Sequence, residues 1–226
     1  MEDHSVVDVG DVRMAYRSWG DQHGNPVILL HGIGGSAASW EKVGQALGEE
    51  WRVHALDLRG HGESDWPDEY DLELMRDDVL EFIEEAKIDR AGVVGHGMGG
   101  VVAYLLAQEH PDRVERLVLE ETPPPYAGAD DPLPKDGPVD YDENAIGEIQ
   151  AQLSDPPAEW LERLGEIVAP TLMITGGAES EMSQEDLPEM ADRIPDCAQI
   201  TLPGGHHIHE RQPQQFADKV SDFFTS

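Results

Sequence analysis

The chain has 226 residues, of which 39% are hydrophobic, so a single domain with a sizeable core is expected. It carries 47 Asp and Glu residues against 15 Lys and Arg, a net charge of −32, which argues against nucleic acid and anionic membranes as partners. No apolar run reaches the roughly 20 residues of a membrane span, and the first residues do not resemble a signal peptide. The single cysteine, Cys197, suits a reducing compartment. We therefore expect a cytoplasmic protein.

Strand-like and helix-like segments alternate along the chain. Residues 27–30 read as a buried strand because four successive apolar residues leave no polar face, and residues 71–86 read as a helix because their apolar positions recur at helical spacing. The expected strands are 6–9, 12–19, 27–30, 52–56, 91–94, 114–120, 171–175 and 199–202. The expected helices are 39–48, 71–86, 99–108, 184–193 and 212–224. Repeated strand–helix units predict an α/β fold, with a mostly parallel sheet and helices on both faces.

One segment interrupts this alternation. Residues 122–169 begin with Thr-Pro-Pro-Pro and are rich in Pro, Asp and Gly, with two short helices expected near 143–153 and 158–167. We predict a cap insertion over the carboxyl edge of the sheet, and the alternative is a surface excursion without function. The chain then forms one domain, 1–226, with its core in residues 1–121 and 170–226.

Two motifs follow the first buried strands. Residues 31–35, His-Gly-Ile-Gly-Gly, come directly after strand 27–30, and glycines here let backbone N–H groups face a pocket, as an oxyanion hole requires. Residues 57–64, Asp-Leu-Arg-Gly-His-Gly-Glu-Ser, follow strand 52–56. We interpret them as a structural turn with internal hydrogen bonds rather than as part of the chemistry.

Residues 95–100, Gly-His-Gly-Met-Gly-Gly, lie between an expected strand and an expected helix. This is the context of a nucleophile elbow, G-x-S-x-G, but Gly97 stands where the serine should be. Glycine has no side chain that could attack a carbonyl carbon, so the ordinary acyl-enzyme route is closed in this chain. The final motif, Gly-Gly-His-His-Ile-His at 204–209, follows the last strand, where a loop can bring a base to the edge of the sheet.

These motifs, HGxGG, DxRGHGxS, GHxMGG and GHxxH in that order, resemble the α/β-hydrolase family over nearly the whole chain. The resemblance implies a triad in the order nucleophile, acid, histidine. It places the nucleophile at Gly97 and the histidine at His206, with the backbone N–H groups of Ile33 and Met98 as oxyanion donors.

The other two histidines of the last motif receive lesser roles in this interpretation. We take His207 as a solvent-facing or lining residue, and His209 as a structural residue that supports the site.

The resemblance leaves the acid with alternatives. Glu179 is the match in the turn after strand 171–175, whereas Glu121 matches family members that place the acid after the strand following the elbow helix, as haloalkane dehalogenases do. An ionised carboxylate at the inner end of a buried strand is costly unless it serves a partner such as an imidazolium. We therefore favour Glu121, with Glu179 and Glu120 as alternatives.

Three functional interpretations remain. The chain is a hydrolase of a small carboxylic ester or lactone disabled at position 97, a natural enzyme in which a His206–Glu121 general base acts on water or on an acidic substrate proton, or a protein that has lost catalysis and binds a small ligand. Trp40, Tyr126 and Met98 are candidate pocket walls or ordinary core residues. We expect a small-molecule substrate and no cofactor or metal, because metal-ligand and phosphate-binding motifs are lacking; the sequence does not specify the oligomeric state.

Overall fold

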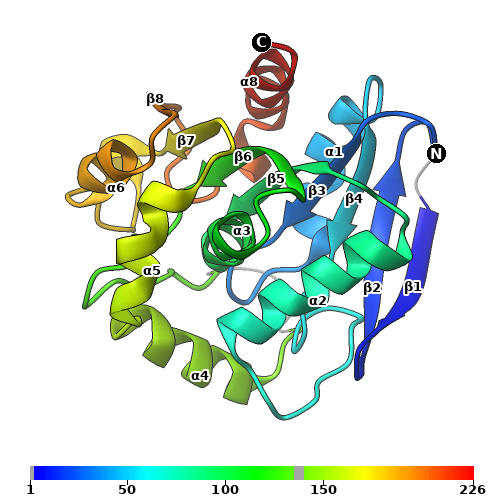
Figure 1. Ribbon diagram of the computed structural model, residues 1–226, viewed down its shortest axis with the longest axis horizontal. Helices are drawn as coiled ribbons and strands as arrows, with labels where there is room; N and C mark the ends of the chain where they lie inside the picture. Colours follow the sequence, from blue (N-terminus) through cyan, green and yellow to red (C-terminus); the bar gives the residue numbers. More distant parts are fainter. Residues whose placement is uncertain (1–2, 135–139) are drawn as a thin grey trace.

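The computed structural model describes residues 3–134 and 140–226, and within them eight strands form one sheet in the order β1-β2-β4-β3-β5-β6-β7-β8 (Figure 1). The strands are β1 Asp3–Val9, β2 Val12–Trp19, β3 Pro26–Leu30, β4 Arg52–Leu56, β5 Ala91–His96, β6 Val114–Glu120, β7 Thr171–Thr175 and β8 Cys197–Thr201. Strand β2 pairs antiparallel with β1 and β4, and every neighbouring pair from β4 to β8 is parallel. The predicted α/β fold with a mostly parallel sheet is confirmed.

Helices cover both faces of this sheet (Figure 1). Helices α2 (Leu72–Glu85) and α3 (Met98–Glu109) pack on one face, and α1 (Glu41–Leu47) and α8 (Pro213–Thr225) on the other. Side chains alternate between the faces along each strand, so each face has its own hydrophobic core. Parallel strands whose two faces are both covered are expected to be apolar throughout, and all of β5 is buried.

Helix α2 shows how the sequence specifies one of these elements. The Asp71 carboxylate accepts hydrogen bonds from the backbone N–H groups of Glu73 and Leu74, at 2.7 and 3.2 Å, and so caps the first turn. The apolar stripe noted in the sequence, which includes Met75 and Phe82, is buried against the core. The predicted helix at 71–86 is confirmed.

The segment between β6 and β7 packs beside α2 and α3 (Figure 1). It contains α4 (Glu143–Ser154), α5 (Ala158–Glu162) and a 3-10 helix at Arg163–Glu166. Trp160 is buried in the same core as α2 and α3, and its indole N–H donates to Glu73 at 3.0 Å. Residues 122–134 run irregularly before α4, and residues 135–139 of the expected cap lie outside the described residues.

Some boundaries differ from the sequence prediction. The helix expected from residue 39 begins at Glu41, after a 3-10 helix at Ala37–Trp40. Helix α6 is only Leu187–Arg193, because Pro188 fixes its first turn, and β8 begins two residues before the expected 199. Helix α7 (Ile208–Arg211) was not predicted, since four residues are too few to show a period. None of the helices in residues 3–134 and 140–226 combines the length and apolarity needed to cross a lipid bilayer.

Candidate active site

The chain turns sharply at Gly97, between the end of β5 and the start of α3. Its backbone has φ 51° and ψ −122°, in the region that disfavours residues with a Cβ. Its N–H donates to the Glu120 carbonyl at 3.0 Å, which ties the turn to the end of β6. The turn brings the first N–H of α3, that of Met98, to the carboxyl edge of the sheet, where the motif at 31–35 also lies.

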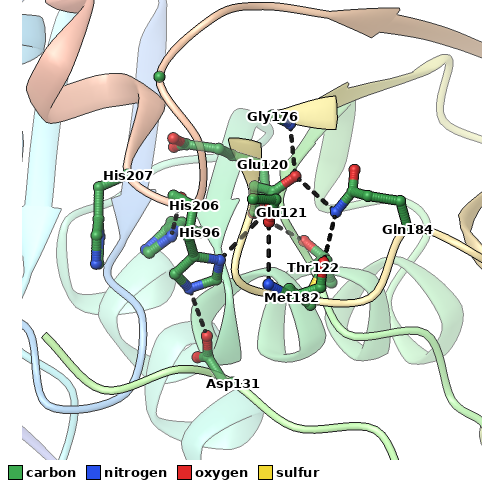
Figure 2. Close-up of polar contacts among 12 residues, drawn as sticks. His96, Glu120, Glu121, Thr122, Asp131, Gly176, Met182, Gln184, His206 and His207 are labelled. Carbon is green, nitrogen blue, oxygen red and sulfur yellow. Dashed lines mark hydrogen bonds and ion pairs between the residues drawn. The ribbon is translucent and has the colours of Figure 1, made fainter. Parts of the chain in front are cut away.

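The side chain that fills the space beside this turn is Asp131, which the sequence analysis did not single out. Its Oδ2 accepts hydrogen bonds from the backbone N–H groups of Ile33 and Met98, at 3.0 and 2.6 Å. Its Oδ1 accepts a hydrogen bond from Nε2 of His206 at 2.9 Å (Figure 2). The side chain is fully buried. The two expected oxyanion donors and the expected histidine therefore converge on one carboxylate of the chain itself.

Asp131 and Gly97 fit against each other. A Cβ added to Gly97 would overlap both carboxylate oxygens of Asp131, so a side chain at position 97 and the present position of Asp131 are mutually exclusive. Asp131 is also held through its backbone, because its carbonyl oxygen accepts a hydrogen bond from Nε2 of Gln150, in α4, at 2.6 Å. The site as it stands is closed by its own carboxylate.

His206 lies between two carboxylates, as Figure 2 shows. Its Nδ1 is 3.4 Å from Oε2 of Glu121, on the side opposite Asp131. Glu121 is 1% exposed and follows β6 with a φ of 45°, a strained conformation for a residue with a side chain. Its Oε1 accepts hydrogen bonds from the backbone N–H of Gly176 at 2.6 Å and from Gln184 at 3.2 Å, and Ser180 donates to Oε2. These donors fix the Glu121 carboxylate beside the imidazole.

The two carboxylates set the protonation of His206. Burial alone lowers the pKa of an imidazole, but here the hydrogen bonds to Asp131 and Glu121, together with their negative charges, raise the pKa of His206 to about 10. At neutral pH the ring is therefore an imidazolium. In this state His206 donates protons, and it can accept one only after Asp131 has moved away.

The two alternative acids lie in different surroundings. Glu120, at the last position of β6, is buried and pairs with Nδ1 of His209 at 2.8 Å. Glu179 is exposed in a 3-10 turn at Gly177–Glu179. The next residue of that turn, Ser180, is the one whose side chain reaches Glu121.

Four histidines gather next to the site. His96 lies 4.6, 5.2 and 4.8 Å, between ring centres, from His206, His207 and His209. Burial lowers the pKa of His96 well below its usual value and that of His207 to about 4, so both are neutral at pH 7. Each of His96, Glu120 and His209 offers a ligand atom for a metal ion within 4.8 Å of the others. These three residues are already hydrogen-bonded, His96 to the His206 carbonyl and Glu120 to His209.

Residues 57–64 form the structural turn that the sequence predicted. The Asp57 carboxylate accepts hydrogen bonds from the backbone N–H groups of Ala37, at 2.6 Å, and Glu63, at 3.0 Å. The turn also supports the motif at 31–35, because Nε2 of His61 accepts a hydrogen bond from the Gly34 N–H at 3.1 Å. These contacts hold the backbone that directly follows Ile33, whose N–H donates to Asp131.

The two aromatic candidates for pocket walls lie in different environments. Trp40 is fully buried, and its ring stacks on His209 with 4.1 Å between ring centres. Tyr126 is half-buried and lines a surface hollow of about 110 Å³ with Pro124 and Met182, and its hydroxyl accepts a hydrogen bond from Arg193 at 3.2 Å. Met98 is fully buried, and it contributes its backbone N–H to the site.

Known sequences match this chain over very different lengths, from 43% to 95% of its residues. The family model of the alpha/beta hydrolase fold matches residues 25–139. A soluble epoxide hydrolase of Corynebacterium sp. (strain C12) is 38% identical over 132 residues, 58% of this chain and 46% of the relative. A putative carbamate hydrolase RutD of Caulobacter vibrioides (strain NA1000 / CB15N) is 40% identical over 105 residues, 43% of this chain and 39% of the relative. In these two matches the chain spans less than half the length of the relative.

Solved structures resemble the chain over its whole length. A hydrolase from Pseudomonas aeruginosa PA01 superposes with a TM-score of 0.87 at 24% identity, covering 99% of both chains. The enol-lactonase from Burkholderia xenovorans LB400 superposes with a TM-score of 0.82 at 22% identity, covering 98% of this chain and 100% of that one. At these identities the structures establish a shared fold.

Proposed function

The chain belongs to the alpha/beta hydrolase fold family, and on that premise we propose that its site is built to hydrolyse a small carboxylic ester or lactone and is disabled by Gly97. One observation carries the proposal. The N–H groups of Ile33 and Met98 donate to one and the same oxygen, while Nε2 of His206 meets the other oxygen of that carboxylate. Two donors on a single oxygen are what a tetrahedral oxyanion requires.

The roles of the residues follow from this arrangement. With a hydroxyl at position 97, His206 accepts its proton as the oxygen attacks the ester carbonyl carbon, and Ile33 and Met98 stabilise the resulting oxyanion. His206 then protonates the departing alcohol, and water hydrolyses the acyl-enzyme. Glu121 orients the ring and stabilises its charge. With glycine at position 97 the first of these steps has no nucleophile.

The names of relatives support the reaction class. The matches include an epoxide hydrolase and a carbamate hydrolase by sequence, and an enol-lactonase by fold. A natural enzyme in which His206 activates water is the alternative mechanism. It requires Asp131 to leave first, because its carboxylate now takes the position beside His206 that the water would need.

The test restores the nucleophile and makes room for it. Since a Cβ at position 97 overlaps the Asp131 carboxylate, the informative variant is Gly97→Ser/Asp131→Ala. We expect it to hydrolyse p-nitrophenyl acetate at least about 10²-fold faster than the parent chain, and to carry an acetyl group on the new serine in mass spectrometry.

The matched control is Gly97→Ala/Asp131→Ala, which has the same shape without the hydroxyl. It should remain as slow as the parent chain. A folded Gly97→Ser/Asp131→Ala protein with neither acyl adduct nor faster hydrolysis would contradict the proposed function.

A further inference from the structure

We propose that the N–H groups of Ile33 and Met98 and the imidazole of His206 form a binding site for a small carboxylate ion, the carboxylate cradle, and that Asp131 is its built-in occupant. The inference rests on the same site as the proposed function and names a ligand class for it. It requires neither a nucleophile nor turnover, so the two proposals can fail separately.

The cradle satisfies both oxygens of a carboxylate at once. Oδ2 of Asp131 has two amide donors, at 3.0 and 2.6 Å, and Oδ1 has the His206 donor at 2.9 Å. A neutral amide would present an N–H group to one of these three donors, and an alcohol has only one oxygen to offer. The donor set therefore matches an anion with two oxygens on one carbon.

The cradle also supplies the charge that a buried anion needs. The Asp131 side chain is fully buried, and an ionised carboxylate in that position is costly unless it is paired and hydrogen-bonded. His206 provides the opposite charge, and the Met98 N–H is the first of the twelve-residue helix α3, whose dipole favours an anion at this end.

Glu121 does not compete for the cradle. It contacts the other ring nitrogen of His206, Nδ1, and has donors of its own in Gly176, Ser180 and Gln184. The cradle and the Glu121 site are thus separate, and removal of Asp131 leaves three buried donors without a partner. Unsatisfied buried donors create a driving force for a free carboxylate to bind.

The size of the space left behind predicts which carboxylate binds. Asp131→Ala keeps the Cβ and removes only the carboxylate, so the vacated space matches formate. Asp131→Gly removes the Cβ as well, so the vacated space matches acetate. A general effect of the salt on the solvent would not depend on whether position 131 is Ala or Gly. A match between formate and Asp131→Ala, and between acetate and Asp131→Gly, would therefore indicate binding in the cradle.

The experiment measures thermal unfolding of the full chain in sodium formate, sodium acetate and sodium chloride at equal ionic strength. We expect formate to raise the Tm of Asp131→Ala by roughly 3–5 °C over chloride at ten times its Kd. Acetate should give the larger rise in Asp131→Gly. The N–H resonances of Ile33 and Met98 should shift in the same titrations.

Three control variants test whether the formate-specific rise in Tm depends on an empty cradle with all its donors. Asp130→Ala alters the exposed neighbouring acid and leaves the cradle filled, so it should show no formate-specific rise. Asp131→Asn keeps a side chain of the same size in the cradle, which leaves no space for a free carboxylate, so it should also show none. Adding His206→Ala to Asp131→Ala should abolish most of the rise, because one of the three donors is lost.

For variants that fold in chloride, either of two results overturns the inference. One is a folded Asp131→Ala protein whose Tm and amide resonances do not respond to formate. The other is an equal response in Asp130→Ala or in Asp131→Ala/His206→Ala. If Asp131→Ala and Asp131→Gly do not fold in chloride, they should refold in formate and acetate, respectively. If neither variant refolds in its matching carboxylate, the inference is also overturned. If Gly97→Ser/Asp131→Ala shows no esterase activity, the proposed function fails, but the outcomes of this carboxylate experiment do not change.

Discussion

Gly97 and Asp131 exclude each other: a Cβ on the glycine would lie on the carboxylate oxygens of the aspartate. The aspartate comes from an irregular segment 33 residues beyond Met98, yet it takes the place next to the turn where an elbow side chain would project. The missing side chain and the inserted carboxylate are therefore two parts of one arrangement. This relationship has consequences for stability as well as for chemistry.

Gly97→Ser should destabilise the chain by about 1–3 kcal/mol, because it places a Cβ at φ 51° and pushes Asp131 out of its cradle. In Gly97→Ser/Asp131→Ala the clash is gone, so the loss should be smaller than the sum of the single losses by about 1–3 kcal/mol. Urea unfolding of the four proteins measures this coupling. Gly10→Ser has a similar φ, 54°, far from Asp131, and its effect should simply add to that of Asp131→Ala.

His206 should make the chain less stable as the pH rises. Its pKa is about 10 in the folded chain and about 6.5 in the unfolded one, so its contribution is complete below about pH 6.5 and is lost as the pH rises toward 10. We expect the free energy of unfolding to fall across this window. In Asp131→Asn, which removes a negative partner, the fall should be shallower. Equal slopes in parent and variant would contradict the assigned ion pair.

Much of this fold can be read from the sequence, for local reasons. The four apolar residues at 27–30 have no polar face and become the buried part of β3. Asp71 is followed by an apolar period and becomes the cap of α2. The motifs at 31–35, 95–100 and 204–209 come after strands whose carboxyl ends meet at one edge, so their convergence follows from the parallel sheet.

Asp131 could not be found in this way. It belongs to an acidic segment, and its neighbour Asp130 is exposed while Asp131 is fully buried, a difference without a local signal. Its position depends on the path of the segment and on the hydrogen bond from Gln150, both of which are tertiary. Glycine at position 97 leaves space beside the turn, but the sequence does not show which residue fills it.

The choice of acid can be tested in the Gly97→Ser/Asp131→Ala background. Glu121→Gln should lower ester hydrolysis by up to roughly 10⁴-fold, because the carboxylate that orients His206 and stabilises its charge is lost. Glu179→Gln changes an exposed side chain and should alter the rate little. Initial rates with p-nitrophenyl acetate compare the two, with circular dichroism to confirm folding. A larger loss from Glu179→Gln would reassign the acid.

Replacing Trp40 and Tyr126 should have very different effects on the free energy of unfolding, because Trp40 is a core residue and Tyr126 lies at the surface. Trp40→Ala removes a fully buried ring that stacks on His209 and should lower the free energy of unfolding by about 3–5 kcal/mol. Tyr126→Ala removes a half-buried ring whose hydroxyl contacts Arg193 and should cost about 1 kcal/mol or less. Urea unfolding measures both losses.

The milder Trp40→Phe, placed in the Gly97→Ser/Asp131→Ala background, should leave the KM for p-nitrophenyl acetate unchanged, because Trp40 is fully buried and stacks on His209. A rise in KM with this variant in a folded protein would instead assign Trp40 to the substrate pocket.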